Sequence, residues 1–256
     1  MDEQAEFSVL SKASYDYFHG GEALANSELR EYGLDYTIDS ELSDSRAVVI
    51  TRPDGSAVVS YRGTDHVSDL VPDFQIAMGY HSNPLYQRVG AVAAHVVTDR
   101  FADARDRYAR AKKKHGSDVS VTGHSLGGSL ALHTARAHGG KAVVFNPGSS
   151  PLAEPFHAAY CTAFDCGYAE RARIYSTGRD PISLSSYIFD QATDDVVKVA
   201  PKDGGDYFAH GLVHFLPRRR AGVHPTYLDP VDTVGGGVVP FCVWCFLSSV
   251  RWGADC

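Results

Sequence analysis

The sequence has no long apolar run, no large basic stripe and few cysteines among its 256 residues. Its most apolar stretch, VVPFCVWCFLSSV (238–250), is interrupted by Pro240 and is shorter than the ~20 apolar residues that a membrane-spanning helix needs. We therefore expect no transmembrane segment. A buried terminal strand is the simpler interpretation of 238–250, and contact with a membrane surface or a partner is the alternative.

Positive charge is sparse, since 24 Lys and Arg stand against 31 Asp and Glu and the net charge is −7. The short clusters KKK (112–114) and RRR (218–220) are typical of solvated surface, so we expect no nucleic-acid partner. The length fits one large domain over residues 1–256. No pattern indicates an oligomeric state.

The five cysteines are an odd number, and the N-terminus MDEQAEFSVLSKASYDYF is acidic and lacks the apolar core of a signal peptide. These features predict reduced thiols and a cytoplasmic or otherwise intracellular location, with non-classical release as the open alternative. Cys242-x-x-Cys245 could serve a redox function or form half of a zinc site, but no second CxxC accompanies it. We expect structural thiols.

Strand-like and helix-like patterns alternate along the chain, which predicts an α/β domain with a mainly parallel sheet. Apolar runs at 47–51 and 57–62 flank the turn RPDGS, which indicates an antiparallel hairpin on one side of the sheet. Further strands are expected at 119–121, 141–145, 171–177 and 196–200. Helices are expected at 5–18, 84–115, from the glycine-serine turn to about His138, and in HGLVHFLP up to Leu216, before Pro217.

The pentapeptide Gly123-His124-Ser125-Leu126-Gly127 has a G-x-S-x-G pattern between a predicted strand and a predicted helix. Glycines two residues either side of the serine let the backbone form a strained turn, the nucleophile elbow. That turn places the hydroxyl at a helix N-terminus, which favours negative charge. The pattern predicts Ser125 as a nucleophile and His124 as a support for the turn; an idle serine in a tight turn is the alternative.

Two motifs about 60 residues apart, VVSYRGTD (58–65) and VTGHSLGGSLA (121–131), resemble the fungal-type class 3 lipases. The continuation RGTDHVSDLVPDF also resembles the family, with Asp73 at a matching aspartate. The resemblance covers roughly residues 45–216. It implies an α/β-hydrolase fold, with helices on both faces of the sheet, and ester hydrolysis without a metal or an organic cofactor.

The resemblance also assigns the groups around the serine. Ser125 would form an acyl-enzyme, and the backbone N–H of Leu126 together with Thr64 would form the oxyanion hole. The Asp-Pro loop IYSTGRDPISL supplies Asp180 as the carboxylate that orients the base, with a surface salt bridge as its alternative role.

The base is expected after Asp180, in the chain order Ser, Asp, His, which leaves His210, His214 and His224. His210 matches the family's spacing to an aromatic and an aliphatic residue five and six positions later, so it is the predicted base. His214 stays open as the alternative. The pair could also bind a metal at i, i+4 spacing, but it has neither an accompanying glutamate nor an evident third ligand.

We therefore predict a carboxylic ester hydrolase, a lipase acting on acylglycerols or phospholipids, with transient contact to a lipid interface. The segment FQIAMGYHSNPLY (74–86) follows the oxyanion turn, where relatives carry a mobile lid, although its apolar side chains could equally belong to the core. Two other hypotheses stay open: an esterase or thioesterase acting on small soluble acyl compounds, and a non-catalytic binding protein with a hydrolase fold. The motifs do not select among individual lipid substrates or chain lengths.

Overall fold

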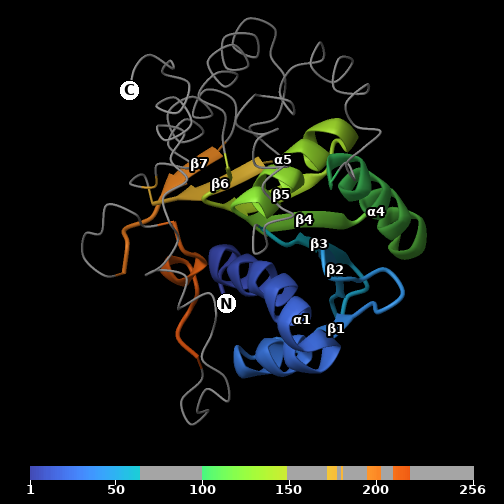
Figure 1. The fold of residues 1–256 in the computed structure, drawn as a ribbon, viewed down its shortest axis with the longest axis horizontal. Coiled ribbons are helices and arrows are strands. Elements are labelled where there is room, and N and C mark those ends of the chain that lie inside the picture. The colour runs from blue at the N-terminus through green and yellow to red at the C-terminus, as the bar shows by residue number, and fades with distance from the viewer. Residues whose placement is uncertain (64–99, 149–171, 178–179, 181–194, 203–209, 220–256) are drawn as a thin grey trace, which may run out of the picture.

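A computed structural model describes residues 1–63, 100–148, 172–177, 180, 195–202 and 210–219 (Figure 1). Within these residues, one seven-stranded sheet has the order β1-β2-β3-β4-β5-β6-β7. The first three strands pair antiparallel and the pairs from β3 to β7 are parallel, which confirms the predicted mainly parallel sheet with an antiparallel hairpin at one side. The strands are β1 (Thr37–Ile38), β2 (Ala47–Thr51), β3 (Ala57–Tyr61), β4 (Val119–His124), β5 (Lys141–Phe145), β6 (Ala172–Ser176) and β7 (Asp195–Lys198).

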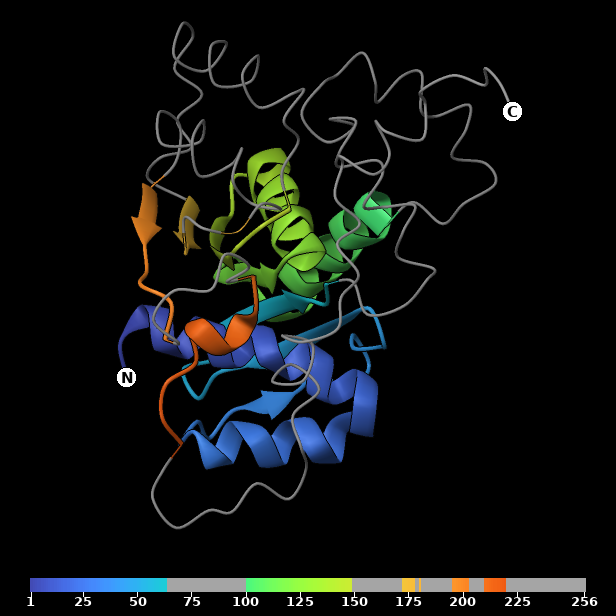
Figure 2. The same cartoon turned by 60° about the vertical axis from the view of Figure 1, so that its left-hand side comes forward.

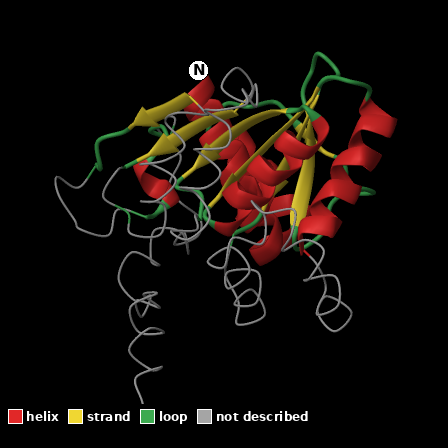
Figure 3. Ribbon diagram, turned by 90° about the horizontal axis from the view of Figure 1, so that it is seen from above, coloured by secondary structure: helices red, strands yellow, loops and turns green. Residues whose placement is uncertain are grey.

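Helices cover both faces of this sheet (Figures 1 and 3). The helix α1 (Glu3–Glu31) lies on one face, and α4 (Arg100–His115) with α5 (Leu126–His138) lies on the other. Each central strand contributes to two apolar cores; in β2, for example, Val48 packs on the α1 side and Val49 on the α4–α5 side. Strands buried on both faces are continuous apolar runs, which is why AVVIT, AVVSY and KAVVF show no polar alternation.

The observed helices differ in length from the expected ones. The carboxylate of Asp2 caps α1 by accepting the N–H of Ala5 at 2.8 Å, and the helix continues past the predicted end at residue 18 through a kink at Gly21 (φ 67°, ψ −164°). The end of α5 matches the expectation, because Gly139 adopts a left-handed conformation (φ 67°). Residues 100–115 of the long predicted helix are helical as α4, whereas 84–99 lie outside the described residues.

The predicted helix in HGLVHFLP is wrong: the segment forms only a short 3₁₀ turn, η3 (Leu212–His214). Gly211 is extended (φ −58°, ψ 143°), and the carbonyl oxygen of His210 accepts from the side chains of His124 and Asn146 instead of from a helical N–H. The segment lies beside α1 (Figure 2), where Ser8 Oγ donates to the carbonyl oxygen of Phe215 at 3.2 Å. Tertiary contacts therefore override the helical spacing.

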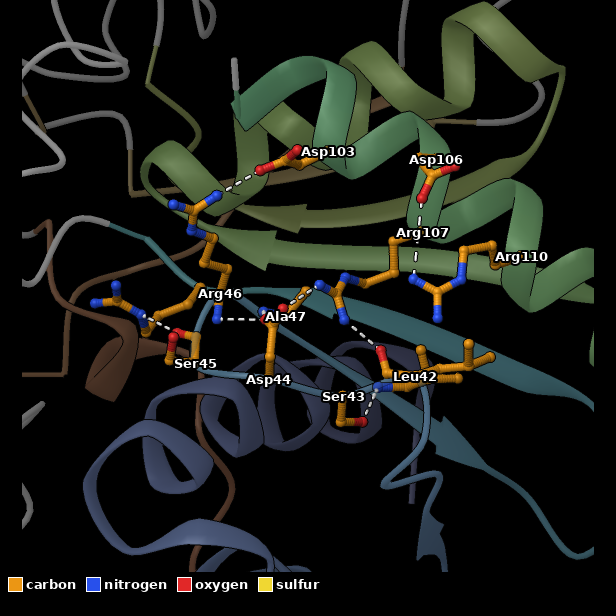
Figure 4. Close-up of polar contacts among 12 residues, drawn as sticks. Leu42, Ser43, Asp44, Ser45, Arg46, Ala47, Asp103, Asp106, Arg107 and Arg110 are labelled. Carbon is orange, nitrogen blue, oxygen red and sulfur yellow. Dashed lines mark hydrogen bonds and ion pairs between the residues drawn. The ribbon is translucent and has the colours of Figure 1, made fainter. Parts of the chain in front are cut away.

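Polar contacts tie α4 to the loop before β2 (Figure 4). Arg107 donates to the carbonyl oxygen of Leu42 and pairs with Asp44, and Arg46 pairs with Asp103. Partly exposed pairs of this kind contribute only ~0–1 kcal/mol each. The buried ring of Tyr108 and its apolar neighbours on α4 therefore dominate the docking of this helix.

Among the described residues, no helix is long and apolar enough to cross a membrane.

In the cluster 218–220, Arg219 differs from the expected solvated surface, because it pairs with Glu28 and Glu31 on α1. A single domain over residues 1–256 stays a prediction. The lid candidate (74–86), the five cysteines and the apolar stretch 238–250 lie outside the described residues.

Candidate active site

Ser125 lies between the last residue of β4 and the first residue of α5, in a backbone conformation that few non-glycine residues adopt (φ 57°, ψ −127°). A Cβ atom on Gly123 would lie 2.3 Å from the carbonyl carbon of Gly127, and one on Gly127 would lie 2.1 Å from the carbonyl oxygen of Tyr61. Both positions therefore require glycine. The strand, strained turn and helix expected of a nucleophile elbow are all present.

His210 bridges Ser125 and Asp180 by hydrogen bonds. Its Nδ1 lies 2.6 Å from Asp180 Oδ2, and its Nε2 lies 2.8 Å from Ser125 Oγ. An ionised carboxylate can only accept, so Nδ1 carries the proton and Nε2 is left to accept the proton of the serine hydroxyl. The Asp180 side chain is fully buried, whereas the His210 side chain remains 24% exposed. The structure thus brings together the three side chains named from the sequence.

The predicted oxyanion donors are only partly described. Leu126 is the first residue of α5, and the N–H groups of a first helical turn have no partner within the helix. That position is compatible with the predicted role of its backbone N–H as an oxyanion donor, which stays a prediction. Thr64 lies outside the described residues, and its role stays a prediction.

His214 has a different environment from His210. It is buried at 8% exposure, and its Nδ1 accepts the backbone N–H of Lys202 at 3.4 Å. That contact ties His214 to the segment that follows β7. His224 lies outside the described residues.

Asn146 is a site residue that the sequence did not reveal. It directly follows β5, is fully buried, and has a positive φ of 39°. Its Nδ2 donates to the carbonyl oxygen of His210 at 3.0 Å, and its Oδ1 accepts the N–H of Thr177 at 3.0 Å. One side chain therefore joins the segment that carries the histidine to the end of β6, which leads to Asp180. The only sequence signal was an asparagine before a proline at a strand end.

His124 contacts the same carbonyl, as its Nε2 lies 2.6 Å from the oxygen of His210. Burial, together with the nearby His210, lowers the pKa of His124 to about 3. The imidazole is therefore neutral at ordinary pH, and its expected support of the turn extends to the segment that holds His210. Within the described residues, no cluster of three or more His, Cys, Asp or Glu side chains could hold a metal ion.

The chain was compared with protein families, solved structures and curated proteins. The model of the Tle-like phospholipase domain, a phospholipase-like family, matches residues 6–184. A fungal lipase solved as an inhibitor complex is similar to the chain at 15% identity and a TM-score of 0.40, with 68% of this chain and 69% of the lipase covered. A comparison with curated proteins gave no match. Because the family model matches well over half of the sequence, the chain belongs to the Tle-like phospholipase domain family.

Proposed function

We propose that this chain hydrolyses carboxylic ester bonds of lipids, with phospholipids as the first substrate class and acylglycerols as the second. The observation that carries the proposal is the arrangement of Ser125, His210 and Asp180 at 2.8 Å and 2.6 Å on a nucleophile elbow. The family match supports the lipid substrate, because the matching model describes a phospholipase domain.

In the proposed mechanism, Ser125 Oγ attacks the ester carbonyl carbon while His210 Nε2 takes the hydroxyl proton. Asp180 holds the imidazole in the tautomer with a protonated Nδ1 and stabilises the imidazolium that forms. The carbonyl oxygen becomes an oxyanion, which accepts from the N–H of Leu126 and, as proposed, from Thr64.

Collapse of the tetrahedral intermediate expels the alcohol, which leaves with the proton from His210. Ser125 then carries the fatty acyl group as an ester. A water molecule gives a proton to His210 and attacks this acyl-enzyme, and the second intermediate releases the fatty acid and regenerates the serine hydroxyl. No step requires a cofactor.

The proposal is tested by release of fatty acid from phosphatidylcholine vesicles, triacylglycerol emulsions and soluble esters of increasing chain length. We expect release from the lipid aggregates, with rates that rise with acyl length, since each buried methylene contributes ~0.8 kcal/mol, or about fourfold. Ser125→Ala serves as the matched control and should release no fatty acid above background. A preference for acetate or butyrate esters, unchanged by an interface, would establish the small-ester alternative instead. No turnover of any ester would leave the binding-protein hypothesis.

A further inference from the structure

A buried hydrogen-bond chain runs from α1 to the backbone of His210. The hydroxyl of Tyr15, on α1, lies 3.1 Å from the backbone nitrogen of Gly63 and 3.2 Å from His124 Nδ1. The other ring nitrogen of His124 lies 2.6 Å from the carbonyl oxygen of His210. The chain therefore joins four segments that are distant in sequence: α1, the end of β3, the end of β4 and the segment before η3.

Only one arrangement of protons satisfies this chain. A carbonyl oxygen can only accept, so His124 Nε2 carries the proton that it donates to His210. The ring is neutral, because burial lowers the pKa of His124 to about 3, so Nδ1 has a free lone pair. Tyr15 must donate its single proton to that lone pair, and its oxygen then accepts the N–H of Gly63. Every group in the chain is paired.

Gly63 shows how closely the chain approaches the nucleophile. A Cβ atom on Gly63 would lie 2.2 Å from the hydroxyl oxygen of Tyr15, 2.7 Å from the carbonyl oxygen of His124 and 3.4 Å from the Cβ atom of Ser125. A side chain at this position would separate Tyr15 from the backbone. Gly63 also immediately precedes Thr64, the proposed oxyanion donor. The Tyr15 hydroxyl therefore holds the backbone one residue before that donor.

We propose that Tyr15 and His124 are positioning residues of the ester hydrolysis, which hold the backbone before the oxyanion donor and the backbone of the base in one hydrogen-bonded chain. This inference rests on the proposed function. Both side chains act on the groups that flank the serine hydroxyl. Because catalysis is sensitive to misplacement of about 1 Å, loosening either end of the chain should slow turnover more than it weakens substrate binding.

The test uses variants that break single bonds of the chain. Tyr15→Phe keeps the ring but leaves the N–H of Gly63 and the Nδ1 of His124 without their partner. His124→Gln places an amide N–H near the carbonyl oxygen of His210 but withdraws the acceptor of Tyr15. Tyr36→Phe is the matched control. It removes a hydroxyl that donates at 3.0 Å to Glu6, which lies on α1 like Tyr15 but is not part of the hydrogen-bond chain.

The measurements are kcat and KM on the ester that the wild type hydrolyses, counted per active site by phosphonate labelling, with thermal unfolding alongside. We expect Tyr15→Phe and His124→Gln each to lower kcat per labelled site by about tenfold or more, with KM changed less than about threefold. Tyr36→Phe should stay within about twofold in kcat, even where it lowers the unfolding temperature as much. In the double variant, kcat per labelled site should be no more than about threefold lower than in the less active single variant. Both changes break the same Tyr15–His124 bond, so their effects should not multiply.

A kcat per labelled site within about twofold of wild type in both single variants would overturn the inference and reduce the chain to a stabilising contact. Fully multiplicative losses in the double variant would also overturn it, because the two residues would then act independently. If Tyr15→Phe does not fold, the kcat and KM of His124→Gln test the inference against the same limits. A folded wild type without turnover or labelling would overturn the proposed function itself, and this inference with it.

Discussion

At the scale of single residues, the backbone carbonyl of His210 distinguishes the two histidines of HGLVHFLP. It accepts hydrogen bonds from His124 at 2.6 Å and from Asn146 at 3.0 Å, one side chain from the end of each of two neighbouring strands. Those bonds hold the His210 ring between Ser125 and Asp180. His214, four residues later, is held instead by the N–H of Lys202. The hydrogen bonds of the local backbone therefore distinguish the two histidines, whereas their i, i+4 spacing in the sequence does not.

Replacing each histidine tests this difference. His210→Ala should lower kcat by several orders of magnitude, because it removes the imidazole that takes the Ser125 proton in the proposed mechanism. His214→Asn should keep at least roughly a tenth of the activity, a loss of ~1.4 kcal/mol or less in transition-state stabilisation, since an asparagine oxygen can still accept the N–H of Lys202. Steady-state kinetics on both folded variants checks the prediction. An inactive His214→Asn beside an active His210→Ala would make His214 the base.

The sequence named the residues that carry reactive groups but missed those that hold them. The proximity of Ser125, Asp180 and His210 could be predicted because the elbow and the family's chain order constrain residue types at fixed places. Tyr15 and Asn146 could not, because their roles depend on contacts across more than 60 positions of sequence. Tyr15 lies in the segment predicted as a helix over 5–18. The sequence does not indicate which groups its hydroxyl contacts.

At the scale of elements, α1 is bent at Gly21 and its two halves are joined by buried charges. Lys12, before the kink, lies 2.6 Å from Asp16 and 3.0 Å from Glu28, which follows the kink. Arg219 also contacts Glu28, at 3.1 Å, and so attaches the segment after η3 to the same cluster. These ions link the helix that carries Tyr15 to the segment that carries His210. The pattern of residues 5–18 predicted the first half of α1 but not its continuation past the kink at Gly21.

Removing Lys12, the cation shared by these carboxylates, should lower the free energy of unfolding. Lys12 is only 1% exposed, so Lys12→Met leaves two carboxylates buried without their shared partner. Breaking a buried ion pair from one side typically costs ~3–5 kcal/mol. Lys113→Met, at an exposed position on α4, should change the unfolding free energy by ~0.5 kcal/mol or less. Denaturant unfolding of both variants measures the difference, and equal small changes would show that Lys12 does not support the fold.

At the scale of the whole molecule, the parallel order of β3, β4, β5 and β6 gathers the site at one edge of the sheet. Gly63, Ser125, Asn146 and Asp180 each follow the carboxyl end of one of these strands. Open α/β sheets bind ligands at such edges. The alternation of apolar runs predicted the strands and their direction. It did not predict the two-residue strand β1, which is too short to show an apolar pattern, and it predicted an α-helix where η3 forms only a 3₁₀ turn, because tertiary contacts override the local spacing there.

Covalent labelling of Ser125 tests the central claim most directly. An organophosphonate ester probe reacts much faster with an activated serine than with an ordinary one, so intact-mass analysis of the folded wild type should show one adduct. Ser125→Ala should show none at the same probe concentration. The account is contradicted if folded wild type acquires no adduct from both short-chain and long-chain probes, or if the adduct persists in Ser125→Ala.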